Sequence, residues 1–227
     1  MQSMHNRILR KLKIRTWVGF VILLVLAGCA TDGKIKPEKV SQEPSLEKDF
    51  SVTQLEDGRK GFIITEVSQM DESSRKDFER AVAIMKDQEY EKAVDILEKI
   101  IEKSPGVTAP YIDIAIAYQH IDKPERAEEN LKAALQLVPD HPVASNEYGL
   151  LCRKAGRFDD ARTIYEKAIA RFPDYYPVHR NLGILCDLYL NDPVCALEHY
   201  EIYSEAKPKD KQVKLWIADL RARLGRN

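Results

Sequence analysis

The stretch that decides the fold is residues 108–141, which read TAPYIDIAIAYQHIDKPERAEENLKAALQLVPDH. In each half of it, apolar and small side chains recur three and four residues apart, which is the spacing of one face of an α-helix. The face in the first half consists of Tyr111, Ile114, Ala115 and Tyr118, and the face in the second half consists of Ala127, Leu131, Ala134 and Leu135. The stretch therefore predicts two amphipathic helices that pack against each other as a hairpin.

The same pattern returns every 34 residues from Ser74 onward, which indicates a repeat architecture. Two columns hold small residues, a third holds large apolar residues and a fourth holds proline. The small columns are Ala81, Ala115, Gly149, Gly183 and Ala93, Ala127, Ala161, Ala196; the large column is Leu97, Leu131, Tyr165, Tyr200; the prolines are Pro105, Pro139, Pro173, Pro208. Helices cross closely only where their contact residues are small, large residues fill the space between hairpins, and proline ends the second helix of each unit.

One residue is inserted in the last unit. The first small column keeps its spacing of 34 from Gly149 to Gly183, whereas the second lengthens to 35 from Ala161 to Ala196. The extra residue therefore lies between Gly183 and Ala196. We expect it in the turn Leu190-Asn191-Asp192-Pro193.

These columns resemble the tetratricopeptide repeat, and the resemblance covers roughly residues 74–209. It implies an all-α solenoid of four helical hairpins, at residues 74–107, 108–141, 142–175 and 176–209. After Pro208, apolar residues continue at helical spacing, at Val213, Trp216, Ile217, Leu220 and Leu224. A solenoid end otherwise exposes an apolar face, so we assign residues 210–224 to a capping helix. The alternative is that its tryptophan-bearing face docks on a partner.

The amino terminus predicts export and lipid anchoring. Residues 1–28 contain no acidic residue, and a basic leader precedes a short apolar run. This run is about half the ~20 apolar residues that a membrane-spanning helix needs, so residues 1–28 are interpreted as a signal peptide. The sequence Leu26-Ala27-Gly28-Cys29 resembles the lipobox of bacterial lipoproteins, which implies cleavage before Cys29 and lipidation of that cysteine. An uncleaved signal anchor is the alternative.

The lipobox resemblance also implies a location. Ala30 follows the cysteine where an Asp would favour the inner membrane, so we expect the periplasmic face of the outer membrane. Loss of the signal peptide removes five of 35 basic residues and leaves 36 acidic ones, a net charge of about −6. A mildly acidic chain without a basic stripe is not expected to bind nucleic acid. Residues 29–49 are polar and contain two prolines, so we expect a flexible tether.

Residues 50–72 differ from the tether. Two β-prone runs, one beginning at Phe50 and one at Phe62, flank the dipeptide Asp57-Gly58. This pattern predicts a small hairpin or an extended segment. Because a lone hairpin is marginally stable in water, we expect the segment to dock on the helical body.

The sequence indicates no catalysis, no metal site and no cofactor besides the lipid on Cys29. The five histidines form no His-Glu-x-x-His motif, no Cys-x-x-Cys pair is present, and there is no glycine-rich phosphate loop. We expect the histidines to be hydrogen-bonded or at the surface, and the carboxylates to form solvated helix faces. The chain is therefore expected to bind a partner and not to act as an enzyme.

Three cysteines remain besides Cys29. Cys186 and Cys195 flank the lengthened turn on antiparallel helices, which can bring them to the ~5.5 Å Cα separation that a disulfide prefers. An oxidising periplasm permits such a bond, so we favour this pair. Cys152 shares an interface column with Cys186. The alternative is that all three cysteines are small buried hydrophobic residues.

The first helix of each unit lines the concave face in this architecture. One column of residues on that face is apolar in all four units, namely Val82, Ile116, Leu150 and Ile184. We expect an apolar or amphipathic protein segment to bind in this groove. Chaperone-binding members of the family hold a peptide carboxylate with Lys, Asn and Arg in these columns, and the present residues largely differ. The predicted groove residues are Phe78, Val82, Ile112, Ile116, Asn146, Leu150, Arg153, Arg180 and Ile184. Alternatively, residues 50–70 of the same chain fill the groove, or the column packs within the solenoid.

Periplasmic lipoproteins of this plan resemble three kinds of scaffold. One is the pilus-biogenesis lipoprotein that helps an outer-membrane secretin assemble, another recruits peptidoglycan hydrolases, and the third belongs to the barrel-assembly machinery. Consecutive 34-residue repeats behind a lipobox favour the first, although its members usually carry more repeats. Homo-oligomerisation through the solenoid is a further alternative.

Overall fold

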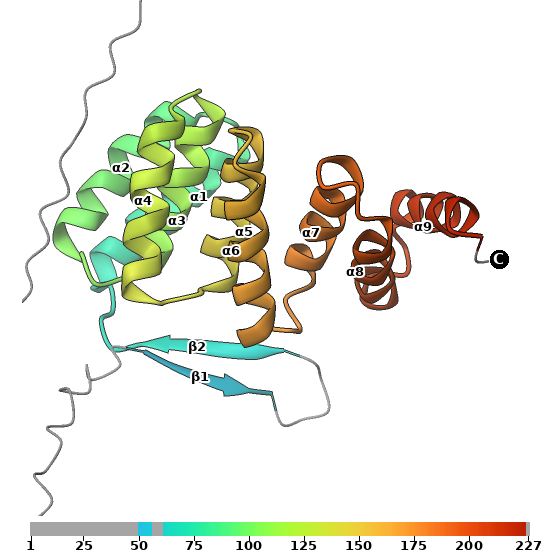
Figure 1. Ribbon diagram of the computed structural model, residues 1–227. Helices are drawn as coiled ribbons and strands as arrows, with labels where there is room; N and C mark the ends of the chain where they lie inside the picture. Colours follow the sequence, from blue (N-terminus) through green and yellow to red (C-terminus); the bar gives the residue numbers. More distant parts are fainter. Residues whose placement is uncertain (1–49, 56–60, 226–227) are drawn as a thin grey trace, which may run out of the picture. The chain divides into compact units, whose positions relative to one another are not determined.

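A computed structural model describes residues 50–55 and 61–225, whose arrangement is shown in Figure 1. Within these residues the chain forms two strands followed by nine helices. The strands are β1 (Phe50–Gln54) and β2 (Phe62–Glu66); the helices are α1 (Glu72–Lys86), α2 (Tyr90–Lys103), α3 (Thr108–His120), α4 (Pro124–Leu137), α5 (Pro142–Lys154), α6 (Phe158–Arg171), α7 (Tyr176–Leu188), α8 (Pro193–Ala206) and α9 (Lys211–Arg223). The predicted signal peptide, Cys29, the tether and the Asp57-Gly58 turn lie outside the described residues.

Four helical hairpins follow one another along the chain. Helix α1 packs on α2, α3 on α4, α5 on α6 and α7 on α8, and the second helix of each hairpin packs on the first helix of the next. The first helices of neighbouring hairpins also contact one another. The prediction of an all-α solenoid is confirmed, and α1, α3, α5 and α7 form one layer of it (Figure 1).

The small and large columns form the core. All of their residues are buried. Glycine stands in the small column where the facing large residue is tyrosine, because a Cβ on Gly183 would lie 2.6 Å from Cδ1 of Tyr200, and one on Gly149 would collide with the ring of Tyr165. The first two hairpins hold alanine and leucine at the same places. The last two hairpins thus have glycine in place of alanine and tyrosine in place of leucine. The smaller glycine leaves room for the larger tyrosine, so the two helices still pack closely.

The turn inside each hairpin places one residue in the left-handed region of backbone conformation. These residues are Gln88, Asp122, Gly156 and Asn191, with φ between 51° and 76°. They follow the same spacing as the core columns, 34 residues for the first three and 35 for the last. The first three turns have three residues and the fourth, residues 189–192, has four. The predicted insertion in the last turn is therefore confirmed.

Each second helix ends two residues before its proline, because the residue that precedes a proline is pushed out of the helical region. After Pro208 the side chain of Asp210 caps α9, and α9 packs on α8. It buries Val213, Ile217 and Leu220 in the core of the last hairpins. The predicted capping helix is confirmed, with Asp210 and Leu224 as its cap residues.

Helix α9 is also in register with the repeat, a relation that sequence reasoning missed. Ala218 lies 35 residues after Gly183, which continues the first small column across the lengthened unit. Among the described residues no second helix follows α9, and Ala218 is exposed. Helix α9 thus has the register of the first helix of a fifth unit, and it packs on α8 as α5 packs on α4 and α7 on α6.

The two strands form an antiparallel hairpin in which Phe50 pairs with Glu66 and Gln54 pairs with Phe62. One of its faces turns toward the loops between helical hairpins. The ring of Phe62 lies 4.8 Å from that of Phe172, centroid to centroid, and the Arg171 guanidinium lies 4.9 Å from the centre of the Phe50 ring. The β-hairpin therefore docks on the loop that joins α6 to α7.

The β-hairpin also docks on the start of α3, through Glu66, the residue that pairs with Phe50. The backbone N–H of Thr108 donates a 2.8 Å hydrogen bond to Oε2 of Glu66. Helix α3 has no side-chain cap of its own, because its N-cap residue is Val107, so Glu66 supplies an acceptor and a negative charge at the positive end of the helix. The segment thus docks on the helical body, as we expected. Its contacts lie on loops and helix ends, so the alternative that it fills the groove is wrong for its described residues.

Candidate protein-binding groove

The apolar column predicted to line the groove keeps part of its surface accessible. Val82, Ile116, Leu150 and Ile184, one from each first helix, are all half-buried. Ile116 and Ile184 pack against the core with one side. The alternative that this column packs within the solenoid thus holds in part for these two residues. Their remaining surface is still accessible to a ligand. The column is an apolar strip that crosses four helices.

The neighbouring predicted column is less accessible than expected. Phe78 and Arg180 are half-buried, but Ile112 and Asn146 are only 4% and 7% exposed. Nδ2 of Asn181 donates a 2.8 Å hydrogen bond to Oδ1 of Asn146, which ties α7 to α5. Ile112 and Asn146 therefore hold neighbouring helices together and offer little surface to a ligand. Sequence spacing alone could not distinguish residues that line the groove from residues that pack between the helices.

An acidic column runs beside the apolar one, and sequence reasoning missed it. Glu79, Asp113 and Glu147 stand 34 residues apart, each directly after a residue of the Phe78 column, and Asn181 ends the series. Burial raises the pKa of Asp113 to about 6, and Asp113 has no ion-pair or hydrogen-bond partner within the described part of the chain. The regular spacing was the signal that could have revealed this column. It gives the groove a negative stripe along its first three hairpins.

The carboxy-terminal part of the groove carries two cations in place of carboxylates. The guanidinium of Arg153 lies 5.6 Å from the centre of the Tyr189 ring, and that of Arg180 lies 5.4 Å from the centre of the Trp216 ring. Both arginines are half-buried, and neither forms a salt bridge with a described residue. Burial raises the pKa of the fully buried Tyr165, and Arg153, which lies beside its hydroxyl, opposes this rise.

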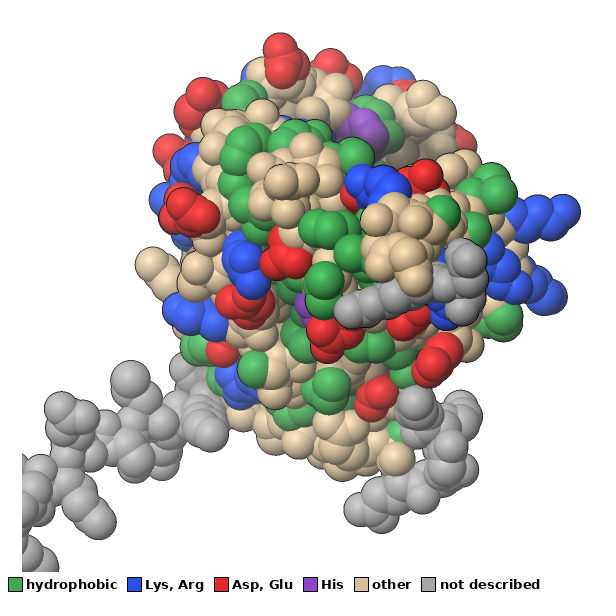
Figure 2. Space-filling view, turned by 45° about the vertical axis from the view of Figure 1, so that its right-hand side comes forward, with side chains coloured by type: hydrophobic (Ala, Val, Ile, Leu, Met, Phe, Trp, Pro, Cys, Tyr) green, Lys and Arg blue, Asp and Glu red, His purple; other side chains and the backbone are tan. Residues whose placement is uncertain are grey.

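A pocket of about 430 Å³ opens at this end of the groove. It lies between α7, α8 and α9, and it is lined by Ile184, Leu188, Tyr200, Trp216, Asp187, Asp219 and Arg223. Leu188 is 67% exposed, whereas Tyr200 is buried beneath the pocket and its ring lies 5.2 Å from that of Trp216. Figure 2, which turns the side with α7 to α9 forward, shows hydrophobic side chains exposed between charged ones on this face. The sequence predicted either that the face of α9 with Trp216 caps the solenoid or that it docks on a partner, and in the structure Trp216 lines both the core and this pocket.

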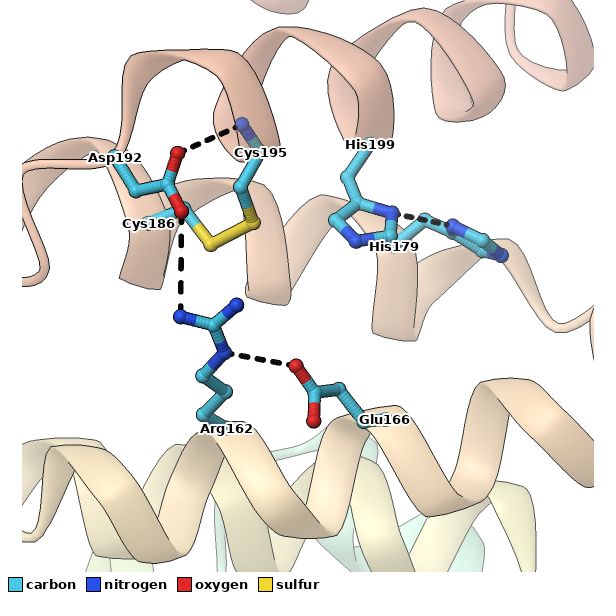
Figure 3. Close-up of a disulfide and its surroundings, with 7 residues drawn as sticks. All are labelled: Arg162, Glu166, His179, Cys186, Asp192, Cys195 and His199. Carbon is cyan, nitrogen blue, oxygen red and sulfur yellow. Dashed lines mark hydrogen bonds and ion pairs between the residues drawn. A yellow bond between two sulfur atoms is a disulfide. The ribbon is translucent and has the colours of Figure 1, made fainter.

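The buried histidines are satisfied by hydrogen bonds. Nε2 of His179 lies 3.1 Å from the carbonyl of Pro173, and its Nδ1 lies 3.1 Å from Nδ1 of His199 (Figure 3). Because the carbonyl only accepts, Nε2 of His179 carries the proton, and a neutral His179 accepts from the Nδ1–H of His199. Burial lowers the pKa of both rings. These histidines therefore form a neutral structural pair.

A disulfide joins Cys186 and Cys195 across the fourth turn, with their Cα atoms 6.0 Å apart. This is the pair that the spacing favoured. Asp192 lies in the same turn, accepts a 3.0 Å hydrogen bond from the backbone N–H of Cys195 and lies 4.0 Å from Arg162 of α6 (Figure 3). Cys152 is free and buried, and burial raises its pKa to about 11. The lengthened turn is thus covalently closed and held to the preceding hairpin.

The described residues offer no cluster of three or more His, Cys, Asp or Glu side chains that could hold a metal ion. Within the same part of the chain, every helix is too short or too polar to cross a membrane. The groove itself combines an apolar strip, an acidic stripe and, near an aromatic pocket, Arg153 and Arg180.

Sequence models of the tetratricopeptide repeat match residues 75–106 and 112–176. The type IV pilus assembly protein PilF of Pseudomonas aeruginosa is 22% identical over 209 residues, which cover 91% of this chain and 72% of that protein. The probable peptide N-acetylglucosaminyltransferase SPINDLY of Petunia hybrida is 29% identical over 93 residues. That match covers 41% of this chain but 10% of the plant protein, so this chain spans about a tenth of its length.

Solved structures share the fold. The structure of Pseudomonas aeruginosa PilF matches with a TM-score of 0.62 at 23% identity, over 67% of this chain and 69% of that one. A crystal structure of MamA matches with a TM-score of 0.56 at 20% identity, over 64% of this chain and 85% of that one. At these identities the likeness extends to the repeat architecture, and the groove residues have to be judged by their own geometry.

Proposed function

We propose that this tetratricopeptide-repeat protein is a lipid-anchored periplasmic scaffold at the outer membrane, and that it binds another protein in its groove during assembly of an envelope complex such as a pilus secretin. The observation that carries the proposal is the accessible apolar column, Val82 to Ile184, which crosses the first helices of four consecutive hairpins. A column of this kind suits an extended or helical segment of a partner. In this proposal the protein binds its partner and catalyses no reaction.

Two further observations support the pilus context. The similarity to the pilus assembly protein PilF covers 91% of the chain, which includes the residues before the repeats. The segment Leu26-Ala27-Gly28-Cys29 at the end of a short apolar run fits lipidation at Cys29, the only cofactor that we propose. Anchoring would hold the groove near an outer-membrane partner and raise the local concentration of the scaffold.

Leu150→Asp tests the proposal in cells that depend on the full chain. A charge at the centre of the apolar column should weaken partner binding, because the carboxylate would have to lose water on contact with an apolar segment. We expect the amount of assembled secretin multimers to fall to the level of a strain that lacks the gene. Thr163→Asp, which places the same charge on an exposed position of α6, is the control and should leave assembly intact.

The fold is measured separately. Leu150 is half-buried, so the purified variant should keep its helical circular dichroism and lose at most a few degrees of melting temperature. Normal multimers in a strain with a folded Leu150→Asp protein would remove the groove from the proposed function.

A further inference from the structure

We propose that the carboxy-terminal end of the groove recognises an acidic residue next to an aromatic residue in the partner segment. The aromatic side chain enters the pocket between α7 and α9, and the side-chain carboxylate pairs with Arg153 and Arg180. This inference rests on the proposed function and specifies the chemistry of the partner.

The first argument is the state of the two arginines. Each is half-buried and stacked on an aromatic ring, Arg153 on Tyr189 and Arg180 on Trp216, so both guanidiniums are held in place before a ligand arrives. Neither has a carboxylate partner among the described residues. A partly desolvated guanidinium without a counter-charge is a strong donor for a carboxylate, and bidentate pairing adds geometric specificity.

Four carboxylates of this region already have partners. One is Asp210, which accepts hydrogen bonds from the backbone N–H of Val213 and from the Tyr203 hydroxyl, and whose pKa is lowered by these bonds and by the charge of Arg180. Asp187 and Asp219 both bind Arg223, and Glu147 accepts hydrogen bonds from the side chains of Gln119 and Asn146. Lys154 on the same helix as Arg153 donates to the uncharged Gln119. Arg153 and Arg180 can therefore bind an anion without breaking a salt bridge between described residues.

The second argument is the exchange of residues in the core columns. Leucine fills the large column in the first two hairpins, so packing alone does not require the tyrosines of the last two. Tyr165 and Tyr200 cross glycines and carry their hydroxyls toward the first helices, where Tyr200 lines the pocket and the buried Tyr165 lies beside Arg153. Burial raises the pKa of Tyr200. The positive charges of three nearby arginines oppose this rise, namely those of Arg180, Arg153 and Arg223. The tyrosines thus bring donors to the place where the cations converge.

The third argument is the pocket itself. Its volume of about 430 Å³ falls within the range of pockets that bind small ligands, and it exceeds the volume of one aromatic side chain. Ile184 and Trp216 form apolar walls, and the exposed Leu188 stands at the mouth. An aromatic ring in this position would stack near Trp216. Arg180 lies outside the lining of the pocket but 5.4 Å from the centre of the same Trp216 ring, where it can meet the acidic neighbour.

The test uses the full chain with Trp17→Phe, which leaves Trp216 as the only tryptophan. The probes are three labelled decapeptides of Gly and Ser, amidated at the carboxy terminus, whose central pairs are Asp-Phe, Lys-Phe and Asp-Ala. Amidation leaves the side-chain carboxylate as the only one offered. Fluorescence anisotropy of the label gives the affinity, and the Trp216 emission reports whether the pocket is occupied.

We expect the Asp-Phe peptide to bind at least about tenfold more tightly than either other peptide and to change the Trp216 emission. Arg180→Gln should bring the Asp-Phe and Lys-Phe affinities together. Arg126→Gln, which removes one exposed cation from α4, should leave the tenfold difference intact. Equal affinities for Asp-Phe and Lys-Phe, or no binding of Asp-Phe at millimolar concentration, would overturn this inference. The proposed function would still stand if Leu150→Asp abolished assembly in the same circumstances.

Discussion

At the scale of single residues, the pairing of glycine with tyrosine sets how closely the last two hairpins pack. We predict that Gly149→Ala lowers the free energy of unfolding by about 2–3 kcal/mol, because the new methyl group would overlap the ring of Tyr165. The second substitution Tyr165→Leu should restore most of the loss, since Ala with Leu is the pair that the first two hairpins use. Urea unfolding of the two single variants and the double variant measures the coupling. Additive losses in the double variant would show that this contact does not decide the packing.

His141 gives the chain a dependence on pH at a single residue. Its Nδ1 accepts a 3.4 Å hydrogen bond from the backbone N–H of Ala144 and caps α5, and burial lowers its pKa to about 4. The folded state therefore binds this proton less readily than the unfolded chain, whose histidine pKa is about 6.5. The stabilisation from neutral His141 is complete above about pH 6.5 and is lost as the pH falls toward 4.

We predict that the free energy of unfolding falls between pH 7 and pH 4.5, and that His141 contributes on the order of 2 kcal/mol to the fall. His141→Asn should keep the cap, since asparagine is a favoured N-cap residue, and should remove this part of the pH dependence. The buried pair His179 and His199 contributes in the same direction, so a smaller slope should remain. Urea midpoints of both proteins at pH 7, 5.5 and 4.5 measure the difference. Parallel pH curves would exclude His141 as a source of the effect.

At the scale of elements, the β-hairpin and α3 stabilise each other through Glu66. We predict that Glu66→Ala speeds amide hydrogen exchange in β1 and β2 and lowers the free energy of unfolding by about 1 kcal/mol, because α3 loses its only side-chain acceptor at the N-terminus. Thr65→Ala, one residue earlier on the exposed face of β2, is the matched control and should leave exchange near its original rate. If the rate of amide hydrogen exchange in β1 and β2 were unchanged in both variants, the aromatic contacts at Phe172 alone would hold the β-hairpin on the helices.

The elements also show how far periodicity carries a prediction. The four hairpins, the insertion in the fourth turn and α9 were all predictable, because each repeat places the same residue types in the same local surroundings. The docking of the β-hairpin on Phe172 and Thr108 was not, since it depends on residues far apart in the sequence. The register of α9 as a fifth first helix was in principle readable from Ala218, but the apolar face of α9 alone suggested a cap or a face that docks on a partner.

At the scale of the whole molecule, the proposed anchor at Cys29 would decide where the groove operates. We predict that Cys29→Ala moves the chain from the membrane fraction to the soluble fraction, because several acyl chains bind a membrane far more strongly than the polar segment that follows them. Cys152→Ala, which alters a free cysteine in the core, should remain with the membrane. Cell fractionation with mass spectrometry of the amino-terminal peptide measures both the location and the lipid. Membrane retention of an unlipidated Cys29→Ala protein would contradict the anchor.

The sequence by itself determined the repeat unit, its number and its register, because helical hairpins are specified by small, large and proline residues at short range. It also singled out the apolar column from Val82 to Ile184 and the cysteines 186 and 195. Only the tertiary structure decided which neighbouring residues are accessible, since Ile112 and Asn146 share a column with Phe78 and Arg180 but are buried between helices. It also brought Arg153, Arg180, Tyr200 and Trp216 to one end of the groove. The physical reason is that a repeat fixes contacts along the chain, whereas a binding surface depends on side chains that different units place next to one another.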